Sequence, residues 1–334
     1  MDLRLPAADD LHIHLRNDAR TEKAIEAVRF GGTSRVLAMP NTLPAISNGV
    51  DANGYESFLK ENGADFEILT TIKLTGNTTA EDIESAAKKG VVAVKQYPMG
   101  VTTNSDDGVE DVRKLYPIYE AIRDRDLVLS LHGEVPGVFV MDAEAAFLES
   151  LLEIHRNFPT LKIVLEHITT KAAVGMVCDL PANVAGTITD HHLLITLDDV
   201  VGSRIQPHHF CMPVAKRPGD RSALVEVVRS GHASFFSGTD SAPHMVADKE
   251  SACGCAGIFN SPYHMQFLAT FFQEQGMLNR LEAFTSQFGA EFYGLNRNSE
   301  EIILTPGKLK VPDRFGPMVP FRSGETLAFN LSWV

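Results

Sequence analysis

The chain has 334 residues, of which 44% are hydrophobic and 22% are charged, a composition typical of a globular protein with a large core. Its formal net charge of −13 disfavours nucleic acid and anionic membrane as general partners. The chain contains no apolar run of about 18 residues, the length that a membrane-spanning helix needs. The first residues, MDLRLPAADD, lack the pattern of a secretory signal, so a cytoplasmic location is the expectation.

Short apolar runs alternate with amphipathic segments along the chain. Eight runs rich in Val, Ile and Leu are strand-like: 10–15, 35–41, 66–72, 91–97, 127–133, 162–168, 183–189 and 233–240. Apolar residues at helical spacing mark segments between them, such as 19–30, 80–90, 111–126, 142–158 and 221–231. Buried strands separated by helices favour a parallel sheet. Eight such units predict an eight-stranded (β/α) barrel of the TIM type, with a doubly wound open sheet as the alternative.

The last quarter of the chain has a different pattern. From about Ser261 it predicts additional helices over 264–275 and 278–295, followed by an extended tail over 324–334. The sequence has no internal repeat, and no Gly-, Ser- or Pro-rich linker divides it. We therefore expect residues 1–334 to form a single domain.

Metal-capable side chains stand in or at the ends of the strand-like runs. They are His12, His14, Lys95, His132, His167 and Asp240. His12 and His14 form an HxH pair, and the two-residue period of a strand sends both to one side. In a barrel the strand ends meet at one rim, so these residues would form a site for Zn²⁺ or a related ion.

Each of these residues alone is better explained as a satisfied polar group, or, for Asp240, as a helix cap. Lys95 is chemically the oddest of them, because an unpaired ammonium at the end of a buried strand is costly. Together, the strand-end positions favour the metal site. An alternative left open is a barrel enzyme that uses the histidines as acid–base groups without metal. Seven of the eight other histidines, all except His244, are interpreted as structural or surface residues.

Seven short motifs bear a resemblance to a known family. In chain order they are HIHLR, MPN, VKQYP, TTNS, LHGE, EHITT and GTDSAPH, and KESACGCAG follows the last of them. The sequence resembles the amidohydrolase superfamily and, within it, the shorter, bacterial-type dihydroorotases. The HxH pair is shared by the whole superfamily, whereas EHITTK, GTDSAPH and KESACGCAG are typical of dihydroorotases.

The resemblance implies a centre of two zinc ions. His12, His14 and Asp240 would bind the more buried ion, and His132 and His167 the more exposed one. Lys95 would bridge both as an N-carboxylated lysine. The carbamate turns a buried cation into an anion with two oxygens, which suits two divalent ions.

The same resemblance implies the groups that bind substrate. Arg16, Asn41 and His244 would bind the substrate carboxylate, for which the forked donors of arginine are well suited. Backbone groups near Met212 and Ala256 would hold the ring amide. Thr102 and Thr103 would form the tip of a lid loop, although an ordinary polar loop explains them equally well.

The activity implied is the reversible cyclisation of N-carbamoyl-L-aspartate to L-dihydroorotate and water in pyrimidine biosynthesis. In the hydrolytic direction a hydroxide between the ions would attack the ring carbonyl, with Asp240 as general base and then general acid. Two alternatives stay open: another cyclic amidohydrolase, such as a hydantoinase or allantoinase, and a catalytically silent scaffold homologue. A homodimer is consistent with the resemblance.

Overall fold

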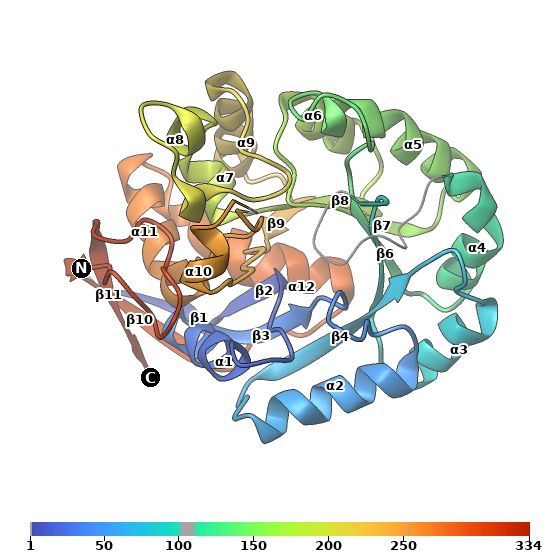
Figure 1. Ribbon diagram of the computed structural model, residues 1–334, viewed down its shortest axis with the longest axis horizontal. Coiled ribbons are helices and arrows are strands. Elements are labelled where there is room, and N and C mark those ends of the chain that lie inside the picture. Colours follow the sequence, from blue (N-terminus) through green and yellow to red (C-terminus); the bar gives the residue numbers. More distant parts are fainter. Residues whose placement is uncertain (1, 101–110, 253) are drawn as a thin grey trace.

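Eight parallel strands form the centre of the protein in a computed structural model that describes residues 2–100, 111–252 and 254–334 (Figure 1). They pair in the order in which they occur along the chain. The strands are β2 Ala8–Ile13, β3 Thr33–Ala38, β4 Glu67–Leu74, β5 Ala93–Gln96, β6 Val128–His132, β7 Lys162–Glu166, β8 Val184–Ile188 and β9 Phe235–Ser237. Beyond β9, Ser241 forms a parallel bridge with Ile13, and Asp240 N–H donates to His12 O at 2.8 Å. These contacts close the sheet, so the predicted barrel is confirmed.

Helices connect the strands of this barrel, and a further helix directly follows its last strand. They are α1 Thr21–Phe30, α2 Gly49–Glu61, α3 Ala80–Lys88, α4 Tyr116–Asp124, α5 Ala143–Asn157, α6 Lys171–Asp179, α7 Asp190–Leu194, α8 Asp198–Val201, α9 Pro218–Ser230 and α10 Val246–Lys249. Local sequence sets several of their ends. Thr79 and Asp82 form a capping box at α3, and α9 ends at Gly231 in the left-handed conformation, as helix termini require.

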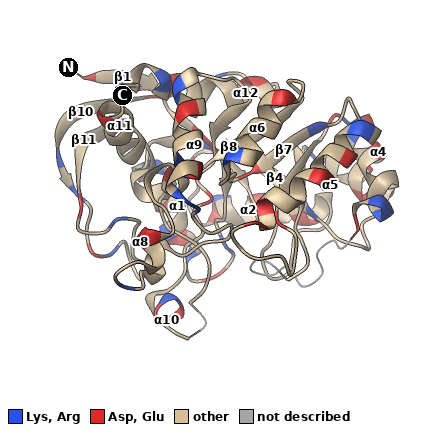
Figure 2. Ribbon diagram, turned by 90° about the horizontal axis from the view of Figure 1, so that it is seen from above, with Lys and Arg blue, Asp and Glu red and all other residues tan. Residues whose placement is uncertain are grey.

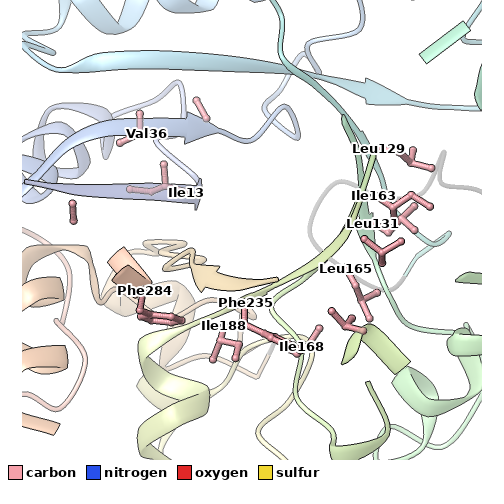
Figure 3. Packing of buried hydrophobic residues seen from close by; sticks show 14 of the residues in the cluster. Ile13, Val36, Leu129, Leu131, Ile163, Leu165, Ile168, Ile188, Phe235 and Phe284 are labelled. Carbon is pink, nitrogen blue, oxygen red and sulfur yellow. The ribbon is translucent and has the colours of Figure 1, made fainter. Parts of the chain in front are cut away.

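Two apolar layers hold the barrel together. Alternate strand residues point inward and fill the lower interior, including Leu11, Leu37, Val128, Val164 and Phe236. The residues between them point outward and pack under the helices (Figure 3). On β6, for example, Leu129 and Leu131 lie in this outer layer. The inward positions at the carboxyl ends of the strands are polar, and these positions build the site.

The carboxyl-terminal part adds both helices and a second sheet. Helices α11 His264–Glu274 and α12 Phe288–Tyr293 confirm the two predicted helical regions, with a π-helical turn at Ala283–Gln287 before α12. The tail forms β11 Thr326–Trp333, which confirms the extended prediction. It pairs with β10 Glu301–Lys310, which pairs in turn with β1 Leu3–Pro6, all antiparallel. The sequence analysis did not predict this three-stranded sheet.

Charged residues of both signs lie along the outer helices, and α8 and α10 lie at the opposite end of the barrel from α12 (Figure 2). Within the described residues, no helix is long and apolar enough to cross a membrane. That residues 1–334 form a single domain stays a prediction.

Candidate metal and substrate site

The HxH pair and Asp240 meet at the carboxyl rim of the barrel. The β2–β3 pairing shifts register between Asp10 and Ile13, and beyond it His12 and His14 point to the same side, with ring centroids 5.5 Å apart. Asp240 Oδ1 lies 3.1 Å from His14 Nε2 and 3.5 Å from His12 Nε2. The structure therefore brings the end of β2 and the segment after β9 together, as the sequence analysis expects of strand ends in a barrel.

His12 and His14 each have an acceptor beside Nδ1. The other ring nitrogen, Nε2, is left with a lone pair that faces Asp240. His14 Nδ1 donates to Asn41 Oδ1 at 2.7 Å, and His12 Nδ1 lies 2.9 Å from Glu166 Oε2. Burial lowers the pKa of His14 to about 4, so its Nε2 carries a lone pair at neutral pH. That lone pair faces a carboxylate oxygen, an arrangement that a cation between them stabilises.

His132 and His167 lie on the other side of the same cavity. Their ring centroids are 4.6 Å apart, and His167 lies 5.0 Å from His12. His132 Nε2 donates to Glu134 Oε2 at 2.8 Å, which leaves Nδ1 as its ligand atom. His167 Nδ1 is buried and has no hydrogen-bond partner among the described residues. Burial lowers the pKa of both rings, so both are neutral donors for a metal.

Lys95 enters the site from β5 and is fully buried. Its Nζ has no hydrogen-bond partner in the part of the chain that the structure describes. Burial lowers the pKa of Lys95 to about 8, although Glu166 and Asp240 oppose this effect. The Tyr97 ring centroid lies 5.2 Å from Nζ, but a buried amine with no hydrogen-bond acceptor and a lowered pKa is a poor structural group, and it is chemically suited to carboxylation and metal binding.

Two buried carboxylates support these ligands, and the sequence analysis did not assign them a role. Glu166 accepts hydrogen bonds from Ser130 Oγ and, at 2.6 Å, from Thr187 Oγ1, and it faces His12. Glu134 holds His132 as described. Such partners fix the ring orientation and tautomer of metal-binding histidines. An acidic residue inside the apolar run KIVLEH was the available signal for Glu166.

Three residues of the site have left-handed backbone conformations. Arg16 has φ 62°, His167 has φ 40° and Asp240 has φ 48°. For non-glycine residues this conformation costs on the order of 1–3 kcal/mol each and is concentrated at functional sites. The strain at Asp240 is offset locally, because Asp10 accepts hydrogen bonds from Thr239 N–H at 2.8 Å and Thr239 Oγ1 at 2.6 Å.

Arg16 and His244 form a cationic corner beside the metal-capable residues. Arg16 Nη2 lies 3.2 Å from His244 Nε2, and Arg16 Nε donates to Pro243 O at 3.3 Å. His244 Nε2 donates to Ala256 O at 3.0 Å, so two donors lie side by side here. Burial and the nearby Arg16 and Arg20 lower the pKa of His244 to about 3, which keeps this ring neutral.

The remaining predicted residues divide into two groups. Met212 and Ala256 line the same cavity as the histidines, and so does Asn41. Asn41 uses its side-chain oxygen on His14, a contact that the sequence analysis did not predict. Thr102 and Thr103 lie outside the described residues.

A second cluster of metal-capable side chains, His191, His192 and Cys211, lies next to the cavity. Both nitrogens of His192 are already used, because Nδ1 accepts from Thr189 Oγ1 at 2.9 Å and Nε2 donates to Pro213 O at 3.0 Å. Cys211 Sγ also donates to Pro213 O, at 3.2 Å. His192 and Cys211 are therefore satisfied by protein groups, whereas His191 Nε2 is buried with no hydrogen-bond partner among the described residues.

Comparisons with known proteins agree with this geometry. Residues 58–171 match the amidohydrolase family model. The chain is 42% identical to a dihydroorotase from Nitrosococcus oceani over 99% of both chains. It also superposes on the crystal structure of dihydroorotase from Saccharomyces cerevisiae in complex with 5-fluoroorotic acid, with a TM-score of 0.95, 36% identity, and coverage of 99% of this chain and 98% of that one.

The chain belongs to the dihydroorotase family. A hydantoinase from Arthrobacter aurescens matches with a TM-score of 0.85 but only 16% identity, over 100% of this chain and 85% of that one. That likeness shows a shared fold alone. The dihydroorotase family is therefore favoured over the hydantoinase alternative by sequence as well as by fold.

Proposed function

We propose that this member of the dihydroorotase family interconverts N-carbamoyl-L-aspartate and L-dihydroorotate at a centre of two zinc ions. The observation that carries the metal proposal is the set of facing lone pairs at His12, His14 and Asp240. The unpartnered Lys95 Nζ and His167 Nδ1 supply two further ligand atoms. A mixed set of imidazole nitrogens and a carboxylate oxygen suits Zn²⁺.

The ligand set divides as the sequence analysis expects. His12, His14 and Asp240 would hold one ion, His132 and His167 the other. Lys95, carboxylated at Nζ, would contact both. Two divalent ions would make a water molecule nucleophilic at neutral pH and would polarise the ring amide carbonyl.

The protein's own groups orient the substrate and move the proton. Arg16 and His244 would bind the substrate carboxylate, with the His244 Nε2–H turning from Ala256 O to the substrate. Asn41 would fix the orientation of the His14 ring beside it. Backbone groups at Met212 and Ala256 would hold the ring amide. In hydrolysis, the Asp240 carboxylate would take a proton from the attacking water. It would then pass that proton to the ring nitrogen as the carbon–nitrogen bond breaks.

The proposal is tested by turnover with and without metal. Purified protein is assayed with dihydroorotate, carbamoyl-aspartate, hydantoin and allantoin, before and after treatment with a chelator. We expect turnover of the first two only, loss of turnover on chelation, and recovery on addition of zinc. Turnover that persists in metal-free protein would contradict the metal centre. Fully metallated protein that leaves dihydroorotate unchanged would contradict the reaction and favour the scaffold alternative.

Arg16 gives a prediction about specificity. In Arg16→Met the charged hydrogen bonds to the substrate carboxylate are lost, which amounts to about 1.5–3 kcal/mol. We expect KM for dihydroorotate to rise about 10- to 100-fold, whereas any slow turnover of dihydrouracil, which lacks the carboxylate, keeps its KM. The measurement is steady-state kinetics with both substrates. A change in KM of the same size for both would show that Arg16 acts on the site in general.

A homodimer and a cytoplasmic location stay predictions of the sequence analysis.

A further inference from the structure

Lys249 is a buried lysine outside the metal centre, in the KESACGCAG segment. It is the last residue of α10 Val246–Lys249 and is 3% exposed. Its ammonium donates to three backbone carbonyls: Cys255 O at 2.7 Å, Gly257 O at 2.8 Å and Phe210 O at 2.9 Å. The three donors of the group are therefore all used, which is the full capacity of a lysine ammonium.

The three carbonyls belong to two chain segments that are far apart in sequence. Cys255 and Gly257 flank Ala256, and Phe210 stands two residues before Met212. Met212, Ala256 and Gly257 all line the cavity that contains the metal-capable residues. Lys249 thus joins, from behind, the two backbone segments that the proposed function places on the substrate ring amide.

Other contacts show how closely these two segments are fitted. Gly257 N–H donates to Phe210 O at 3.0 Å, the same oxygen that Lys249 uses. Gly257 has φ 151°, and a Cβ atom there would lie 2.4 Å from Ala242 O, so only glycine fits. Ala256 O accepts from His244 Nε2. A displacement of this loop would therefore move the cavity wall and the carboxylate corner together.

Burying a lysine ammonium between two loops carries a desolvation cost, so its hydrogen bonds must contribute something that an apolar side chain would not. Within the described residues no carboxylate forms an ion pair with Lys249, so the charge is stabilised by the carbonyl dipoles and by the Phe210 ring, whose centroid lies 5.8 Å from Nζ. Burial lowers the pKa of Lys249 to about 8, and at neutral pH the group is still mainly an ammonium with three donors. Because an apolar side chain could fill the same space without the desolvation cost, the contacts themselves are what the lysine provides.

We propose that Lys249 is a positioning residue that sets the spacing between the Met212 and Ala256 backbones and thereby determines how tightly the cyclic substrate is bound. It touches neither substrate nor reacting atoms, and it acts through the two backbone segments. The proposal rests on the proposed function, because that function assigns the two segments to the ring amide. Its signature is an effect on binding with little effect on the chemical step.

The experiment compares Lys249→Met and Lys249→Arg with an exposed control, Lys60→Met, whose lysine is paired with Glu56 on the surface. For each metallated protein, KM and kcat are measured with dihydroorotate. The dissociation constant of orotate, a planar analogue with the same carboxylate, is measured by calorimetry. Metal content and the urea midpoint are recorded in parallel, and they report separately on the metal centre and on folding.

For Lys249→Met we expect KM and the orotate dissociation constant both to rise about tenfold, the size of one misplaced hydrogen bond to the substrate. We expect kcat to stay within about threefold, with unchanged metal content. Lys249→Arg should show the same direction, because a planar fork cannot reach three carbonyls around one point. Lys60→Met should match the wild type.

Three results would overturn the proposal. The first is a folded, metallated Lys249→Met protein with the wild-type KM and orotate affinity. The second is a loss confined to kcat. The third is failure of both Lys249 variants to fold, which would make the residue structural only. If only Lys249→Met fails to fold, Lys249→Arg decides: a raised KM supports the proposal and a wild-type KM overturns it. A wild-type protein that neither binds orotate nor turns over dihydroorotate would instead contradict the proposed function itself.

Discussion

Replacing Asp240 by asparagine is expected to lower kcat by at least about 10³-fold in both the ring-opening and the ring-closing directions. General acid–base catalysis contributes about 10²–10⁴-fold, and the change also removes an anionic ligand. Asparagine keeps the shape of the side chain and one ligand oxygen, but it cannot accept and return a proton. The measurement is kcat in both directions, with the metal content of the same samples determined by elemental analysis.

The metal content separates the two roles that we assign to Asp240. Metallated but inactive Asp240→Asn protein would support the role in proton transfer, whereas inactive protein that has lost metal would support the role as ligand alone. Asp179→Asn, at the exposed end of α6, is the matched control and should be fully active. Substantial turnover by metallated Asp240→Asn would refute Asp240 as proton carrier.

The environment of Asp240 explains why such a change is specific. Burial alone would raise the pKa of this carboxyl, but the neighbouring His14 and His12 rings lower it below the ordinary range. Its backbone is held at φ 48° by the hydrogen bond from its own N–H to His12 O. The proton carrier is therefore tied to β2, which carries the proposed ligand His12 and is followed directly by His14.

The barrel and the meeting of the ligands at its rim could be predicted from sequence, because both follow from local periodicity. Strands of alternating inward and outward residues, separated by helices, have few arrangements open to them. The HxH pair points one way because a strand has a period of two. His132, Lys95 and Asp240 each follow or end an apolar run, and parallel strands bring those ends together.

The supporting contacts could not be predicted, because they depend on side chains that meet only in the folded chain. Glu166 contacts His12 across the barrel, and the side-chain oxygen of Asn41 accepts a hydrogen bond from His14. The second sheet pairs Leu3 with Leu304, a contact that no local pattern encodes. Lys249 looks like an ordinary helical lysine in sequence, and only the fold shows that it joins two loops.

The second large effect is expected at Lys95. In Lys95→Met the side chain keeps its approximate size but cannot carry a carboxylate, so the ligand shared by the two ions is lost. We expect the zinc content to fall from about two ions per chain to one or fewer, and kcat to fall by at least about 10³-fold. Lys95→Glu, which restores an anion on a shorter side chain, should recover part of the metal. Full zinc content and activity in Lys95→Met would contradict the bridging role.

The same variant has an opposite effect on the metal-free protein. Burial lowers the pKa of Lys95 from 10.5 to about 8, so the ammonium opposes folding whenever it is charged. By linkage, this cost is fully present below pH 8 and disappears as the pH rises towards 10.5, because in that range the unfolded chain binds the additional proton. At pH 7 it amounts to about 3 kcal/mol.

Metal-free Lys95→Met, with carbon dioxide excluded, should therefore be more stable than the metal-free wild type by about 3 kcal/mol at pH 7. This difference should shrink between pH 8 and pH 10. Urea unfolding of both proteins at several pH values measures the difference. Titrating groups remote from Lys95 cancel because they are common to both, whereas His132, Glu166 and His167 also contribute because the Lys95 charge shifts their pKa values. A variant that is less stable than the wild type at pH 7 would show that Lys95 is a favourable structural residue. In that case the buried ammonium of Lys95 would be stable without carboxylation or metal binding, and its burial would not support either.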